Sequence, residues 1–83
     1  MTFSLIHPAV VDLYLLTLKL NDLGLQLDGY IKYHADPPKK LQIEAEDAST
    51  MFINAEKKAL EFSGSRRILN EQLMLLHTRR GLS

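Results

Sequence analysis

The adjacent prolines Pro37 and Pro38 constrain the fold of this chain more than any other feature of its sequence. A residue that precedes proline is displaced from the α-helical region of backbone space, so Asp36 and Pro37 do not fit inside a helix. A proline is tolerated in the first turn of a helix, because its missing N–H would have no partner there. The sequence therefore predicts that one helix ends before this pair and that a second begins at it.

The segment before the prolines carries an apolar stripe in which the spacing alternates between four and three residues. The stripe consists of Ala9, Leu13, Leu16, Leu20, Leu23, Leu27 and Tyr30. Pro8 suits a first-turn position, so we expect a helix over residues 8–34. The alternative is a pair of strands, because the segment also alternates with period two and Asp28-Gly29 is a favoured hairpin turn. Leucine dominates over β-branched residues, which favours the helix.

The segment after the prolines carries a longer stripe with the same spacing. Its members are Leu41, Ala45, Ala48, Phe52, Ala55, Ala59, Phe62, Arg66, Leu69, Leu73 and Leu76. We expect one helix over residues 39–79, with a break near residues 63–65 as the alternative. Gly64 falls opposite the stripe, where it costs helix propensity but no packing. A short connection makes the two helices antiparallel, so residues 1–83 are expected to form one all-α domain, a helical hairpin.

This hairpin leaves apolar surface uncovered, because at 1.5 Å per residue the second helix overhangs the first by about 20 Å. The overhang carries Ile68, Leu69, Leu73, Met74, Leu75 and Leu76, and the first helix carries a second apolar stripe of Val11, Leu15, Leu18 and Leu25. A chain of 83 residues that exposes so much apolar surface needs a cover for it. We favour homodimerisation into a helical bundle. The alternatives are a fold-back at residues 63–65 and a groove for another protein's helix.

The residue types present argue against most kinds of active site. The chain has no cysteine, which removes disulfides, thiolate metal sites and thiol nucleophiles, and favours a reducing, cytoplasmic location. His7, His34 and His77 lack the spacing of four residues that places two imidazoles on one helix face for zinc. Neither a glycine-rich phosphate loop nor a G-x-S-x-G motif occurs. We expect no enzymatic activity, cofactor, metal or small-molecule substrate.

Charge is balanced overall but unevenly distributed, since the formal net charge is zero while four arginines gather near the C-terminus. They are Arg66, Arg67, Arg79 and Arg80. Spaced cations on a helix can follow phosphates, so a dimeric nucleic-acid-binding regulator is the alternative function. Arg66 also interrupts the apolar stripe. It either pairs with an acidic residue of another chain, such as Asp12 or Asp22, or extends its guanidinium into water.

A helix, the "DPP" corner and a longer helix resemble small secretion-system needle or rod subunits, and equally compact phage-type regulatory proteins. The first resemblance implies a polymerising structural subunit and the second a protein that binds host factors. The apolar run over residues 9–20 is too short to span a bilayer, so we expect no membrane contact. The expected function is a homodimeric protein-interaction module that binds a protein partner as an adaptor, inhibitor or accessory factor.

Overall fold

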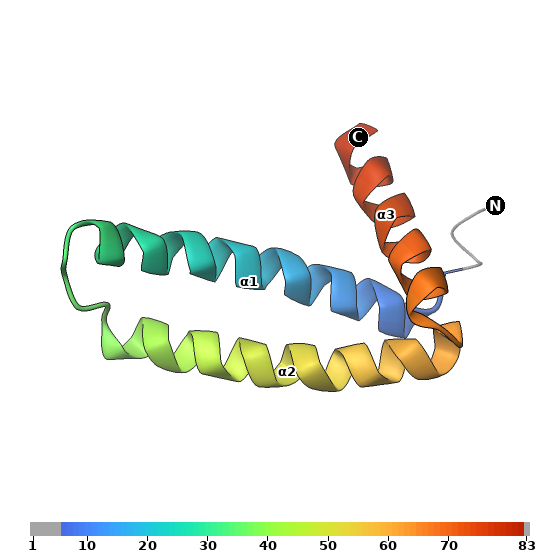
Figure 1. The fold of residues 1–83 in the computed structure, drawn as a ribbon, viewed down its shortest axis with the longest axis horizontal. Coiled ribbons are helices and arrows are strands. Elements are labelled where there is room, and N and C mark those ends of the chain that lie inside the picture. The colour runs from blue at the N-terminus through green and yellow to red at the C-terminus, as the bar shows by residue number, and fades with distance from the viewer. Residues whose placement is uncertain (1–5, 83) are drawn as a thin grey trace.

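The computed structural model describes residues 6–82, and these residues form three helices. Helix α1 spans Pro8–Lys32, α2 spans Lys39–Ser63 and α3 spans Arg66–Leu82. No strand occurs among the described residues, so the all-α prediction is confirmed and the strand alternative for the first segment is wrong. Figure 1 shows α1 and α2 side by side and antiparallel, with α3 leaving the far end of α2 at a steep angle.

Helix α1 begins with a side-chain cap and a proline. His7 occupies the N-cap position in an extended conformation, and its Nδ1 accepts a hydrogen bond of 3.0 Å from the backbone N–H of Ala9. This bond satisfies one of the N–H groups that the first turn of a helix leaves without an intrahelical partner. Pro8 follows in the first turn, where its ring preorganises the backbone for a helix.

Helix α1 ends in a tight backbone motif centred on His34, which has a φ of 55°. The N–H of Ala35 donates to the carbonyl of Tyr30 at 2.9 Å, and the N–H of His34 donates to the carbonyl of Ile31 at 3.1 Å. These two bonds form a Schellman arrangement, which uses carbonyls that the helix end would otherwise leave unpaired. Glycine is the usual residue at the left-handed position, so His34 bears a steric cost there.

Helix α2 begins at Lys39, directly after Pro38. The carbonyl of Pro38 accepts hydrogen bonds from the N–H groups of Leu41 and Gln42, at 3.0 and 3.1 Å. The side chain of Gln42 reaches back and donates to the carbonyl of Pro37 at 3.0 Å. Residues 33–38 therefore connect α1 to α2.

A break after Ser63 separates α2 from α3, so the expectation of one continuous helix over residues 39–79 is wrong. Gly64 adopts the left-handed conformation with a φ of 83°, and its N–H donates to the carbonyl of Leu60 at 2.9 Å. Ser65 then caps α3, because its Oγ accepts a hydrogen bond of 3.3 Å from the N–H of Ile68. The glycine matters for its backbone angle rather than for packing.

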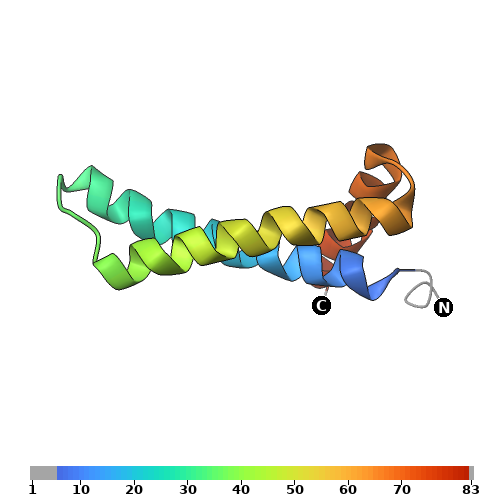
Figure 2. The ribbon, with the colours of Figure 1, turned by 90° about the horizontal axis from the view of Figure 1, so that it is seen from below.

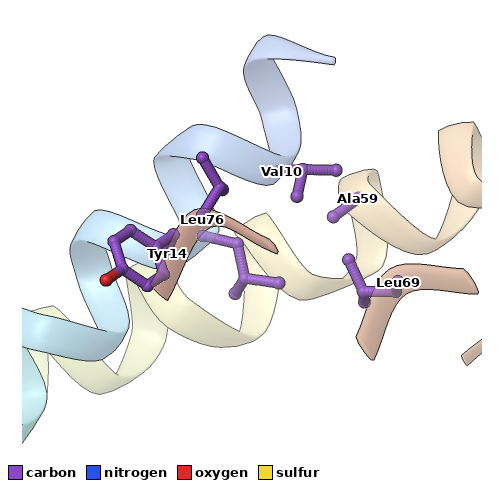
Figure 3. Close-up of a cluster of buried hydrophobic side chains, with 6 residues drawn as sticks. Val10, Tyr14, Ala59, Leu69 and Leu76 are labelled. Atoms are coloured by element: carbon purple, nitrogen blue, oxygen red, sulfur yellow. The ribbon is translucent and has the colours of Figure 1, made fainter. Parts of the chain in front are cut away.

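The break turns α3 back toward the N-terminal part of α1, and three helices meet at this end of the molecule (Figures 1 and 2). Six buried residues fill the junction, and Figure 3 shows them in close-up. They are Val10, Leu13, Tyr14, Ala59, Leu69 and Leu76. A second, smaller cluster of Leu23, Leu41 and Ala48 joins α1 to α2 nearer the connection between them.

The molecule is elongated, with principal extents of 46, 28 and 18 Å and a radius of gyration of 15.0 Å. A compact domain of this length has a radius of gyration of about 12 Å. An elongated chain buries less of its surface than a compact one, so apolar side chains remain exposed. Within residues 6–82, none of the helices combines the length and apolar composition that a bilayer crossing requires.

Candidate functional site

An apolar groove runs between α1 and α2 over the N-terminal half of α1 and has a volume of about 570 Å³. Its lining residues come from both helices: Ala9, Asp12, Leu15, Leu16, Lys19, Met51, Asn54, Ala55 and Lys58. Two of its apolar side chains are more than half exposed, since Leu15 and Met51 each retain 54% of their accessible surface. Exposed apolar surface of this kind, bordered by polar groups, is typical of a contact surface for another macromolecule.

The local sequence explains why the groove is hollow. Ala9 on α1 and Ala55 on α2 carry only a methyl group, so they do not fill the space where the two helices meet. Leu16 reaches into the same space from the main apolar stripe of α1 and is only partly buried. Leu15 and Met51 also line the groove and have longer side chains. The arrangement leaves a depression that a bulky apolar side chain from outside can occupy.

Charged and polar groups border this groove on both helices. Asp12 and Lys19 lie on α1, seven residues apart, and Asn54 and Lys58 lie on α2. The four side chains are exposed, so the charges of Asp12, Lys19 and Lys58 interact through water. The lining contains no histidine or hydroxyl side chain.

Of the residues that we expected to be exposed on the C-terminal overhang, some are buried and others are exposed. Leu69 and Leu76 are buried in the three-helix junction, and Leu73 packs against it. These three side chains are covered by the chain itself, because α3 folds back instead of projecting beyond α1. Ile68, Met74 and Leu75 stay on the outside of α3 and are 38%, 70% and 57% exposed.

The predicted second stripe of α1 likewise contains both partly buried and exposed residues. Val11 and Leu18 are partly buried and pack against the core at the junction with α3. Leu15 lies in the groove, whereas Leu25 is exposed and belongs neither to the groove nor to the cluster at the junction with α3. The junction with α3 therefore covers part of the apolar surface that two antiparallel helices would leave exposed. The remaining exposed apolar surface lies in the groove and on isolated side chains.

The four arginines do not form one continuous basic surface. Arg66 donates from Nη1 to the carboxylate of Glu56 at 2.9 Å, so its acidic neighbour belongs to the same chain rather than to another copy. The Arg66 side chain is about half exposed, so this pair contributes little to stability. Arg67 and Arg80 are exposed, whereas Arg79 is partly buried. At about 100° per residue, the four positions point in different directions around α3.

Sequence reasoning assigned several groove residues to other roles. It placed Ala9, Leu16 and Ala55 in the buried seam and gave Met51 and Asn54 no role. A signal was present, because Leu15 precedes Leu16 and Met51 precedes Phe52, so each of these two exposed residues flanks the seam on the same side. Among the described residues, no three His, Asp or Glu side chains gather closely enough to hold a metal ion.

Comparisons with known proteins add no relative to this description. No protein-family model matches the chain, and neither the curated proteins nor the solved structures contain a match.

Proposed function

We propose that this chain is a non-enzymatic protein–protein interaction module, which self-associates and binds a protein partner as a small adaptor, inhibitor or accessory factor. The observation that supports the proposal is the apolar groove between α1 and α2, with Leu15 and Met51 exposed at its sides. We further propose that residues 33–38 form the corner of a helical hairpin and that the chain assembles as a dimeric helical bundle. A cytoplasmic location is consistent with the lack of cysteine.

A groove between two antiparallel helices is suited to the apolar face of a third helix. Such a helix places side chains at every third or fourth position into the groove and its polar residues toward the rim. Complete burial of a leucine or methionine contributes about 1.5–3 kcal/mol, so Leu15 and Met51, which are already about half covered, each contribute roughly half of that. Lys19, Lys58 and Asp12 at the rim then select the orientation of the bound helix.

Two alternatives have weaker support. Nucleic-acid binding would use the four arginines, but the guanidinium of Arg66 already contacts Glu56. A polymerising structural subunit would need two different complementary surfaces on one chain. Fluorescence anisotropy with duplex DNA and single-stranded RNA tests the first alternative, because phosphate contacts weaken steeply with added salt. Sedimentation velocity tests the second, because open polymerisation continues as concentration rises.

Site-specific photo-cross-linking tests the interaction module directly. Benzoylphenylalanine is placed at Leu15 in the groove in one variant and at Ile31 in a control variant. Ile31 is 67% exposed on the same helix but does not line the groove. Both variants are irradiated alone and in a lysate of the source organism, and the adducts are identified by mass spectrometry.

We expect a specific polypeptide adduct from position 15 and none from position 31. A partner from the lysate must also bind as a purified protein, and Leu15→Gln must weaken that binding. An adduct with a second copy of the chain supports the self-association part of the proposal. If position 15 yields no polypeptide adduct beyond the control in either setting, the groove is not an interaction surface and the proposal fails.

A further inference from the structure

We infer that the groove between α1 and α2 binds the same groove of a second copy, with the two α1 helices antiparallel about a two-fold axis that passes between Leu15 and Leu16. This inference rests on the proposed function, because it names the occupant of the interaction surface.

The charges of α1 that border the groove are complementary to the same charges on a second copy. Asp12 lies at one end and Lys19 at the other, with Leu15 and Leu16 midway between them. Seven residues correspond to about 10.5 Å along a helix. A two-fold axis at the midpoint therefore places Asp12 of each copy opposite Lys19 of the other. One isologous contact forms two equivalent ion pairs.

The opposite orientation of the two helices is unfavourable. If the two α1 helices were parallel and in register, Asp12 would face Asp12 and Lys19 would face Lys19 of the second copy. Like charges placed against each other repel and disfavour that arrangement. The charge order thus selects the antiparallel contact among those that bury Leu15.

Helix α3 does not obstruct this contact. Tyr14 of α1 contacts His77 of α3, and Tyr14 and Val10 both belong to the three-helix junction. Around the helix axis, Asp12, Leu15 and Lys19 lie about 160°, 100° and 140° from Tyr14. The side of α1 that borders the groove is therefore turned away from α3 and is open to a second copy.

The apolar part of the groove is also complementary in shape to the same groove of a second copy. Each copy offers the protruding side chains of Leu15 and Met51 together with the low surface of Ala9 and Ala55. Large side chains of one copy can enter the space left above the alanines of the other, as in the seam of a helical bundle. The formal net charge of the chain is zero, so two copies approach without overall repulsion.

The inference is tested with the purified full chain by sedimentation equilibrium from micromolar to millimolar concentration. Asp12→Lys and Lys19→Asp each replace both ion pairs by like-charge pairs, so each variant alone should dimerise about tenfold more weakly than the wild type. An equimolar mixture of the two variants should form a heterodimer, because every facing pair is then of opposite charge. The double variant Asp12→Lys, Lys19→Asp should regain most of the wild-type affinity.

Two further variants separate loss of the contact from loss of the fold. Leu15→Gln should abolish most of the dimer, whereas Leu25→Gln should not, because Leu25 is 72% exposed on α1 outside the groove. Far-ultraviolet circular dichroism should show the helical content of the wild type in every variant. The chain has no cysteine, so Leu15→Cys should form a disulfide-linked dimer on mild oxidation and Leu25→Cys should not.

A wild-type chain that stays monomeric at millimolar concentration would overturn the inference. So would a dimer in which the charge reversals fail to rescue each other in the mixture. If the chain is monomeric but position 15 still captures a different polypeptide that binds when purified, the partner-binding part of the proposed function stands, whereas its self-association part and this inference are wrong. If position 15 captures nothing, both proposals fail.

Discussion

The imidazole of His7 stacks on the ring of Phe62, with 3.8 Å between the ring centroids and 13° between the ring planes. His7 is the N-cap of α1 and Phe62 lies in the last turn of α2, so the contact joins the start of one helix to the end of the next. The same imidazole accepts the backbone N–H of Ala9. One side chain therefore stabilises both a helix terminus and the packing between two helices.

These two roles of His7 are separable by substitution. His7→Ala removes the cap and the stack and should lower the free energy of unfolding by about 2 kcal/mol, whereas His7→Asn keeps a capping oxygen and should cost about half as much. Urea unfolding measures both. Combining His7→Asn with Phe62→Leu completes a double-mutant cycle. If the two effects simply add, the stacked rings do not stabilise the fold.

Gly64 and His34 both have positive φ values, and substitutions at the two positions should have opposite effects. A methyl group added at Gly64 would meet no atom within 4 Å, so any cost of Gly64→Ala arises from the backbone angle. We expect that variant to lose about 1–2 kcal/mol and His34→Gly to gain up to about 1 kcal/mol. Thermal and urea unfolding measure the changes. A neutral Gly64→Ala would mean that the break between α2 and α3 does not require the left-handed residue.

Ser63 and Ser65 lie on either side of Gly64 and differ in their hydrogen bonding. The hydroxyl of Ser63 is buried and has no hydrogen-bond partner among the described residues, whereas that of Ser65 accepts the N–H of Ile68. Ser63→Ala should therefore raise the free energy of unfolding by about 0.5–1 kcal/mol. Ser65→Ala should lower it by about 1 kcal/mol through loss of the cap of α3. Equal effects of the two substitutions in urea unfolding would contradict this assignment.

Leu69 anchors α3 in the three-helix junction, where its side chain has no exposed surface. Leu69→Ala should cost about 2–5 kcal/mol and loosen α3, so trypsin should cleave faster after Arg66 and Arg67. Met74→Ala is the matched control on the same helix, because Met74 is 70% exposed, and it should change stability by less than about 0.5 kcal/mol. Unchanged cleavage in Leu69→Ala would show that α3 is held by other contacts.

The helical character of the chain followed from its apolar spacing, and the break after Ser63 did not. The apolar spacing of α2 continues in register through Leu69, Leu73 and Leu76. Leu69 and Leu76 are buried and Leu73 packs against them, but in the junction with α1 after a turn rather than along one straight axis. From the sequence, Gly64 is expected to lower helix propensity without affecting packing. Its function depends on backbone angle, which apolar periodicity does not report.

The groove was harder to predict than the helices. The sequence indicated more apolar surface than two antiparallel helices can bury, but not which part of that surface α3 would cover. Leu18 and Leu25 belong to the same predicted stripe, yet only Leu18 packs against the cluster to which α3 contributes. That difference depends on the angle at which α3 leaves Gly64, which is a property of the folded backbone rather than of residue type.

The buried side chains form two separate clusters, which implies that local stability differs between the two ends of the molecule. Three helices interlock around Leu13 and Leu69, whereas only two meet at Leu23 and Ala48 near the connection. Local fluctuations are opposed by fewer contacts at the second place, so the amides flanking residues 33–38 are poised to exchange with solvent while the other end stays closed. The groove lies between α1 and α2 near the three-helix end of the molecule, so its walls are expected to keep their shape while the opposite end opens.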